Sequence, residues 1–425
     1  ETITKWNTQV RIPEIVPEVV RKAFKLAQTE KPGATHIELP EDVAAAEAEG
    51  KPLLVQQPYP TEPLAGQVDR AVEIISEAER PMVLAGNGVA RAGASRALTE
   101  FASTLNLPVA TTFMGKGAIP YTDSHSLLTV GLQARDYVAC GLDRADCVIT
   151  VGYDLVEYSP DRWNPDRDKQ IVHIDMSPAE VDKSYIVSVG VLGDLSVTLR
   201  EIAGRARPSQ DTYTARLRRM ILDELEAYRD DRAFPIKPQR IMSDLRAVLD
   251  PEDIVISDVG AHKMWVARMY PCERPNTAII SNGFASMGIA LPGAVAAKLA
   301  FPERKVVAVV GDGGFLMNVQ ELETAVREGL SFAVLVFTDG GYGLIGWKQE
   351  LKFGRPAYVE FGNPDFLKLA ESFGCAGYRV EAPGELAEIL AEATGLDRPA
   401  VIDCPVDYRE NLKLTEKLGQ LVCPI

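Results

Sequence analysis

Residues 305–347 decide the fold. Three segments of this stretch carry the pattern: KVVAVVGDGGF (305–315), LETAVREG (322–329) and FAVLVFTDGGYG (332–343). The apolar run 306–310 has the length and uniformity of a strand that is buried on both faces. Apolar residues recur at helical spacing over 315–329, and Gly329 marks the helix end. A second apolar run, 332–337, completes a unit of strand, glycine-rich turn, helix and strand. In a parallel sheet, both strand ends fall on the edge that binds ligands.

Each of these strands is followed by an aspartate, Asp312 after the first and Asp339 after the second. Two carboxylates about 4 Å apart repel by roughly 4 kcal/mol at an effective dielectric constant near 20, and a divalent cation between them reverses this. Mg²⁺ prefers carboxylate, carbonyl and phosphate oxygens. Gly313 and Gly314 allow close backbone approach, and the next helix offers free N–H groups to an anion. The pattern predicts a Mg²⁺–diphosphate site formed by Asp312, Asp339 and a carbonyl just beyond, at Gly341. The alternative is two unrelated turns, where Asp is common.

The two turns resemble the signature of enzymes that use thiamine diphosphate, which is Gly-Asp-Gly followed further along the chain by Asn-Asn. Asp312 and Asp339 lie 27 positions apart (339 − 312), and Thr338 and Asp339 replace the two Asn residues. Asp is also an oxygen ligand, so the metal-binding role is retained, whereas the role of Thr338 is left open. The resemblance extends over essentially the whole chain. It is strongest for acetolactate synthases of the catabolic, FAD-independent type.

The resemblance implies which residues hold the cofactor. In the family, a bulky apolar residue at the position of Met287 lies under the cofactor and bends it, and the carbonyl at the position of Ala285 binds the pyrimidine ring. On pattern alone, Met287 is most simply a core residue. Small residues after the strand 254–257 let backbone amides reach a phosphate, and His262 is either a phosphate ligand or only a helix-start residue. The expected cofactor-binding set is Gly260, Ala261, His262, Ala285, Met287, Gly311, Asp312, Gly313, Gly314, Asp339, Gly341, Tyr342, Gly343 and Leu344.

The implied activity is decarboxylation of pyruvate on thiamine diphosphate and addition of the remaining two-carbon unit to a second pyruvate, which gives 2-acetolactate and CO₂. No residue here matches the family's activating glutamate, which belongs to an N-terminal pyrimidine-binding domain and acts across a dimer interface. We therefore expect a homodimer or homotetramer, and little activity from this chain alone. The alternatives are a FAD-dependent acetohydroxyacid synthase, a glyoxylate carboligase, a pyruvate oxidase-like enzyme, or a non-catalytic cofactor-binding fragment.

The choice of acceptor keto acid is left open by one departure from the family. In the biosynthetic relatives a tryptophan beside the substrate favours larger 2-keto acids. By ungapped count from Asp339, that position is Lys348, and Trp347 is one step away. One residue is about 100° of helical rotation, so Trp347 need not face the pocket.

Alternating helical and strand patterns predict an α/β protein with Rossmann-like parallel sheets and helices on both faces. The first residues supply only one helix and one strand, and resemble the end of the pyrimidine-binding domain, so we expect a chain that lacks most of that domain. The expected divisions are a remnant at 1–45, a linker at 46–66, a central domain at 67–204, a connector at 205–237, a C-terminal diphosphate- and Mg²⁺-binding domain at 238–408 and a tail at 409–425.

The central domain carries Gly86-x-Gly88 after an apolar run at 81–85. A dinucleotide fingerprint needs a third glycine where this chain has Arg91, so a tight turn without a ligand is favoured. In flavin-dependent relatives an Arg-containing segment follows the strand at 146–151. Here that segment is Gly152–Tyr158, which resembles the flavin-free enzymes and predicts the absence of FAD.

The composition excludes several other classes of protein. The formal net charge of −15 argues against a nucleic-acid or anionic-membrane partner. Six Cys without a Cys-x-x-Cys pair, and only four His, argue against a zinc site and favour a reducing cytosol. No apolar run approaches the length of a transmembrane helix.

Overall fold

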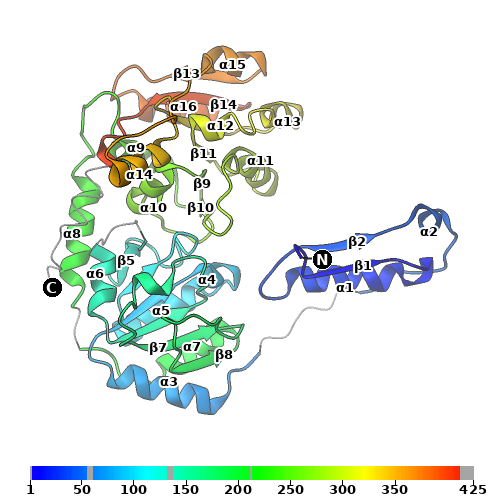
Figure 1. Ribbon diagram of the computed structural model, residues 1–425, viewed down its shortest axis with the longest axis vertical. Helices are drawn as coiled ribbons and strands as arrows, with labels where there is room; N and C mark the ends of the chain where they lie inside the picture. Colours follow the sequence, from blue (N-terminus) through cyan, green and yellow to red (C-terminus); the bar gives the residue numbers. More distant parts are fainter. Residues whose placement is uncertain (1, 55–60, 132–136, 211–212, 412–425) are drawn as a thin grey trace.

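The computed structural model describes residues 2–54, 61–131, 137–210 and 213–411. Two six-stranded parallel sheets, each flanked by helices, form the body of the molecule, and helix α8 (Ala215–Glu226) runs along one side of it (Figure 1). A smaller N-terminal unit lies beside this body. The predicted α/β class with Rossmann-like parallel sheets is therefore confirmed. Within the described residues, no helix is long and apolar enough to cross a membrane.

The central sheet has the strand order β5-β4-β3-β6-β7-β8. Its strands are β3 (Pro81–Ala85), β4 (Val109–Thr111), β5 (Ser126–Thr129), β6 (Cys147–Val151), β7 (Gln170–Asp175) and β8 (Val189–Leu192). Its helices are α3 (Ala65–Glu77), α4 (Asn87–Arg91), α5 (Ser95–Leu105), α6 (Tyr137–Arg144) and α7 (Leu195–Ala203). Numbered within the domain, the order is 3-2-1-4-5-6, the order of dinucleotide-binding sheets, which reverses between β3 and β6.

The C-terminal sheet has the order β10-β9-β11-β12-β14-β13. Its strands are β9 (Ile254–Ser257), β10 (Ala278–Ile280), β11 (Val306–Gly311), β12 (Ala333–Thr338), β13 (Ala376–Arg379) and β14 (Ala400–Pro405). Its helices are α9 (Pro238–Val248), α10 (Ala261–Met269), α11 (Ala290–Ala300), α12 (Asp312–Phe315), α13 (Glu321–Arg327), α14 (Gly343–Phe353), α15 (Phe366–Ser372) and α16 (Leu386–Gly395). β11 and β12 are adjacent and central, as their uniformly apolar sequences predict.

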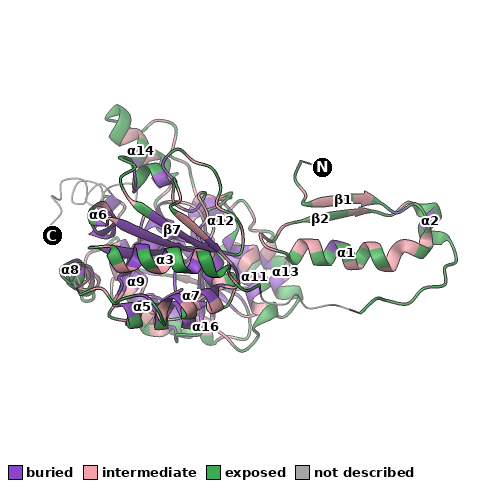
Figure 2. Ribbon diagram, turned by 90° about the horizontal axis from the view of Figure 1, so that it is seen from below, coloured by how far each residue is buried: buried purple, intermediate pink, exposed green. Residues whose placement is uncertain are grey.

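The two sheet domains share one hydrophobic core. A single cluster of buried side chains runs from Met82 of the central sheet through Trp265 of α10 to Leu335 of the C-terminal sheet. All residues of α10 are buried, including Lys263 and Arg268. Figure 2 shows the strands of the body buried and the outer faces of its helices exposed. Helix α10 therefore ties the position of the C-terminal sheet to that of the central domain.

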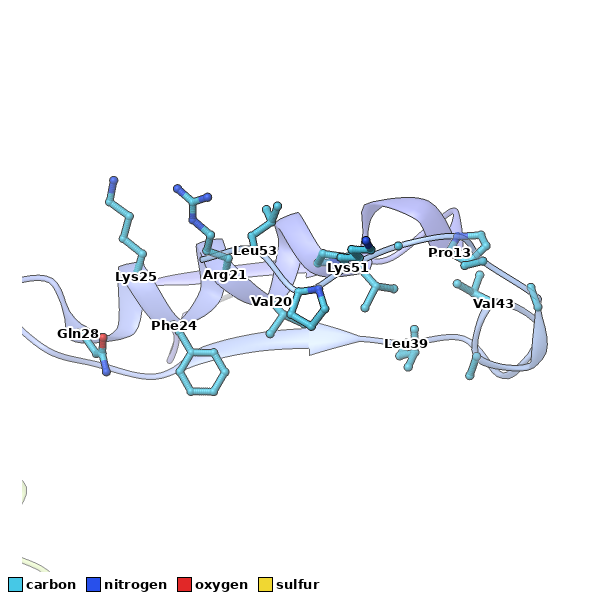
Figure 3. A pocket seen from close by; sticks show the side chains of 17 residues that line it. Pro13, Val20, Arg21, Phe24, Lys25, Gln28, Leu39, Val43, Lys51 and Leu53 are labelled. Atoms are coloured by element: carbon cyan, nitrogen blue, oxygen red, sulfur yellow. The ribbon is translucent and has the colours of Figure 1, made fainter. Parts of the chain in front are cut away.

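The N-terminal unit consists of β1 (Trp6–Gln9), α1 (Val16–Gln28), β2 (Thr35–Glu38) and the short α2 (Glu41–Ala45), with β1 and β2 parallel. The sequence predicts α1 and β2 but not β1. The unit contacts the central domain through ion pairs of Glu30 with Arg91 and of Lys31 with Asp154. The unit also carries an apolar groove of about 590 Å³ (Figure 3), where the Phe24 side chain is 65% exposed.

Three expected helices differ from the structure. The helix expected over 315–329 forms only at α13, because the chain turns at 316–320, where the Asn318 amide donates to the Gly288 carbonyl at 2.8 Å; α12 lies mostly in the glycine-rich turn before it. The small residues from Met287 onward predict a helix that begins at that residue, but α11 begins at Ala290 because Gly288 has a positive φ of 86°. A helix is also predicted over about 135–140; residues 135 and 136 lie outside the described residues, and α6 runs from Tyr137 to Arg144.

Candidate active site

The two acidic turns meet at the C-terminal edge of the second sheet. Asp312 directly follows β11, is 1% exposed, and its Oδ2 accepts hydrogen bonds from the backbone N–H groups of Asp339 (3.2 Å) and Gly340 (2.8 Å). These N–H groups belong to the turn after β12, the neighbouring parallel strand. The Asp312 carboxylate thus fixes the second acidic turn against the first.

The orientation of the Asp312 carboxylate is determined by two further donors. Its Oδ1 accepts from the N–H of Gly313 at 2.8 Å, and its Oδ2 accepts from the side-chain amide of Asn363 at 2.8 Å. The amide oxygen of Asn363 is itself buried without a partner among the described residues. A buried acceptor beside a buried carboxylate calls for a positive or donating group, because an unpaired buried acceptor costs about 1–3 kcal/mol.

The turns border a cavity of about 120 Å³. Thirteen of the fourteen residues in the expected cofactor-binding set line it: Gly260, Ala261, His262, Met287, Gly311, Asp312, Gly313, Gly314, Asp339, Gly341, Tyr342, Gly343 and Leu344. The fourteenth, Ala285, lies outside the lining, two residues before Met287, with a positive φ of 55°. The cavity therefore collects residues from five separate segments of the C-terminal domain, those that follow β9, β10, β11, β12 and β14.

Glycine is required at Gly314 because the turn after β11 lies directly against Asp258. A Cβ on Gly314 would lie 2.1 Å from Oδ2 of Asp258. Asp258 follows β9 and accepts hydrogen bonds from the N–H groups of Gly288 and Ile289, both at 3.0 Å. A third strand-end aspartate thus anchors the loop that carries Met287.

The charges around the cavity are arranged for a cation. Burial, and after it the charge of Asp312, raise the pKa of Asp339 to about 7. The described residues contain no group of three or more His, Cys, Asp or Glu arranged for a metal ion. A cation held by these two carboxylates would need further oxygen ligands, and a diphosphate supplies them.

Two buried polar side chains that border the cavity each have an atom without a hydrogen-bond partner in the described part of the chain. Burial lowers the pKa of His262 to about 3, so its ring is neutral, and its Nε2 has no hydrogen-bond partner among the described residues. The hydroxyl of Tyr408 is also buried and unpartnered within the described part of the chain. Together with the two carboxylates and the glycine-lined turn, these groups fit a bound cation and an anionic cofactor.

Comparison with known proteins identifies the domains. Residues 68–202 match the central domain of thiamine pyrophosphate enzymes, and residues 258–404 match their C-terminal TPP-binding domain. The acetolactate synthase of Bacillus subtilis (strain 168) is 33% identical over 440 residues, covering 99% of this chain and 76% of that protein. The catabolic acetolactate synthase of Raoultella terrigena is 34% identical over 432 residues, with 99% and 76% covered. A probable acetolactate synthase large subunit of Methanocaldococcus jannaschii is 34% identical over 449 residues, with 99% and 74% covered.

The chain belongs to the acetolactate synthase family of thiamine pyrophosphate enzymes. The first match contains the whole central sheet, and the second contains the C-terminal sheet apart from β9 and the last residue of β14; every residue that lines the cavity except Tyr408 lies in this second match. Sequence reasoning missed Asp258, Asn363 and Tyr408 in this site. Only Asp258 carries a local signal, because it is an acidic residue directly after a buried strand.

The residues whose roles the sequence leaves open lie beside the family site but not in it. The hydroxyl of Thr338 donates to Asp403 on β14 at 2.6 Å, and Asp403 pairs with Arg379 at 3.0 Å. Trp347 is buried in the core cluster, and Lys348 is exposed. Thr338 therefore links adjacent strands, and neither Trp347 nor Lys348 lines the cavity.

The point where the strand order of the central domain reverses is filled by the chain itself. The N–H of Gly88 donates to the carbonyl of Gly152 at 2.8 Å, and a Cβ on Gly88 would lie 2.6 Å from Cα of Gly152. The buried carboxylate of Glu157 accepts from the N–H of Asn87 at 3.0 and 3.1 Å and from the hydroxyl of Thr112. An acidic side chain thus occupies the turn where this fold commonly binds a phosphate.

Proposed function

We propose that the chain binds thiamine diphosphate through Mg²⁺ and serves the formation of 2-acetolactate and CO₂ from two molecules of pyruvate. The observation that carries this proposal is that Asp312 and Asp339, at the ends of adjacent parallel strands, line one cavity together with Met287. When bound, thiamine diphosphate supplies the electron sink for loss of CO₂ from a 2-keto acid.

The residues of the cavity divide into two groups by chemistry. Asp312, Asp339 and the carbonyl of Gly341 would hold Mg²⁺, and the N–H groups at the start of α10, beside Gly260, would bind phosphate oxygens. Met287 and the apolar side chains of Leu344 and Ile345, at the start of α14, would exclude water from the bound cofactor. Exclusion of water strengthens the interaction of the neighbouring dipoles with developing charge.

We further propose that the enzyme works without FAD. The support is the self-filled turn of the central domain, where a dinucleotide phosphate would have to displace the Glu157 carboxylate from Asn87 and separate Gly88 from Gly152. The FAD-dependent alternative predicts a yellow protein with a flavin absorption spectrum. A colourless protein that gains no flavin when incubated with FAD would agree with the proposal.

The assembly and the acceptor are extensions of the same proposal. The family resemblance suggests a homodimer or homotetramer with pyruvate as both donor and acceptor. None of the 425 residues matches the activating glutamate of the family, so the first test of this chain is cofactor binding rather than turnover.

The test is calorimetric titration of thiamine diphosphate with and without Mg²⁺. We expect binding that requires Mg²⁺ and that is lost in Asp339→Ala. Asp166→Ala removes an exposed carboxylate far from the cavity and serves as the control. Binding that is equally tight without Mg²⁺, or unchanged in Asp339→Ala, would remove Asp339 from the metal site. Chromatographic analysis of products from pyruvate, in a protein that also carries the activating glutamate, then tests acetolactate formation.

A further inference from the structure

The loop between β10 and α11, residues 281–289, carries both Ala285 and Met287 and has a backbone that needs support. Ala285 and Gly288 have positive φ values of 55° and 86°. A non-glycine residue in this region costs about 1–3 kcal/mol and persists only where the surroundings impose it. Phe284, in the middle of the loop, is almost fully exposed. The contacts that hold the loop are therefore found at its ends.

The second end of the loop is held from within the C-terminal domain. Asp258 accepts from the N–H groups of Gly288 and Ile289, and the Asn318 amide donates to the Gly288 carbonyl. These three bonds fix the start of α11. They leave the segment before Met287 to be fixed from the other end.

The first end is held by Asn282, whose side chain lies between two domains. Its Oδ1 accepts from Nζ of Lys263 on α10 at 2.8 Å, and its Nδ2 donates to the main-chain carbonyl of Glu157 at 3.0 Å. Glu157 belongs to the central domain, in the segment that fills the turn after β3. One amide side chain thus joins α10, the cofactor loop and the central domain.

Both partners of Asn282 are themselves fixed. Lys263 is 7% exposed, and its ammonium group lies 5.8 Å from the ring centre of Phe113 in the central domain. The Glu157 carboxylate is bound to Asn87, so its carbonyl is presented from a rigid segment. Lys116 adds a second crossing between the domains, because its Nζ donates to the Ala267 carbonyl near the end of α10 at 2.8 Å.

We infer that Asn282 is a positioning residue, through which the central domain holds the loop that carries Met287 in its strained conformation. The central domain then has a function in the site of the C-terminal domain although it lines none of the cavity. The effect on cofactor affinity rests on the proposed function, whereas the effect on the loop itself does not.

Hydrogen exchange of the 425-residue chain, followed by mass spectrometry, tests the inference without cofactor. In Asn282→Ala we expect the backbone amides of Gly288 and Ile289, which donate to Asp258, to exchange about tenfold faster than in the wild type, since the loss of two hydrogen bonds at the first end lets the loop open more often. Because coupling is reciprocal, exchange should also rise around Glu157. Ser286→Ala, which removes a polar group from the exposed part of the same loop, is the matched control and should exchange as the wild type does.

Equal exchange of the Gly288 and Ile289 amides in Asn282→Ala and Ser286→Ala would overturn the inference. Lys263→Met is a second variant, in which Asn282 keeps its hydrogen bond to Glu157, so a smaller increase in the exchange rate is expected. This variant also tests the inference if Asn282→Ala does not fold. Titration with thiamine diphosphate and Mg²⁺ should then show about tenfold weaker binding by Asn282→Ala. Absence of binding by the wild type would count against the proposed function alone, because the exchange result does not depend on cofactor.

Discussion

Replacement of Glu157 by Gln should change how the stability of the protein depends on pH. Burial raises the pKa of Glu157 to about 7, opposed by its hydrogen bonds from Thr112 and Asn87; Asp154 adds to the rise and Arg91 reduces it. Between these two pKa values, the Glu157 carboxyl group is therefore protonated in the folded protein and ionised in the unfolded protein. Its contribution to stability is complete below pH 4.5, its ordinary pKa, and is lost as the pH rises through about 7.

The expected magnitude follows from this shift. A rise in pKa from 4.5 to about 7 corresponds to about 3 kcal/mol between the two limits. About 2 kcal/mol of this falls between pH 5.5 and 8, a range above the isoelectric point of about 4.9. Gln has the same shape, does not ionise, and can still accept from Asn87 and donate to Thr112. The variant should therefore lack this component of the pH dependence.

The assay is urea unfolding of the wild type and Glu157→Gln at several pH values from 5.5 to 8. The free energy of unfolding of the variant, minus that of the wild type, should rise by about 2 kcal/mol across this range. Other titrating groups cancel in the difference. Glu79→Gln, at an exposed position, controls for the loss of a charge and should give a flat difference. A flat difference for Glu157→Gln, or one that falls with pH, would refute the reasoning.

Three further predictions concern the site and the contact between domains. Tyr408→Phe removes a buried hydroxyl that has no partner among the described residues, so without cofactor the free energy of unfolding should rise by about 1 kcal/mol. Calorimetric titration should show weaker cofactor binding by this variant. A lower free energy of unfolding would mean that the hydroxyl has a structural partner. Gly314→Ala should cost about 3 kcal/mol in urea unfolding, because the new Cβ displaces Asp258, and a change below about 0.5 kcal/mol would contradict this contact. Burial lowers the pKa of Lys116 to about 8, so above that pH the unfolded state binds more protons than the folded state. The free energy of unfolding of the wild type, minus that of Lys116→Met, should therefore rise by about 2 kcal/mol from pH 8 to 9.5. A difference that does not change with pH would contradict the lowered pKa.

The parts of the fold that the sequence predicts are those with a clear periodicity. The strands predicted at 81–85 and 254–257 have the same bounds as β3 and β9, because each is a short, largely apolar run. The four-residue strands β5 and β8 were not predicted, since they acquire strand geometry only by pairing with longer neighbours. For helix α10 the sequence indicates only a possible start at His262 and not its extent, because the helix is buried on all sides and has no exposed polar face to set a period.

The candidate site shows the same division between local and distant signals. Asp312 and Asp339 were predicted to meet because parallel strands end on one edge, and both line the cavity. Asn363 reaches Asp312 from 51 positions away in the sequence, and Tyr408 comes from beyond the last strand. No spacing rule connects such residues, because their position depends on how the connections after β12 and β14 are folded.

The contact between Gly88 and Gly152 limits how this protein can be altered. Since neither backbone leaves room for a Cβ on the other, a substitution in one turn requires a matching rearrangement of the other. A nucleotide-binding site could be introduced into the central domain only if both turns and the segment that carries Glu157 were redesigned together. Single substitutions made one at a time would give intermediate variants in which the Gly88–Gly152 contact is lost and no nucleotide is bound.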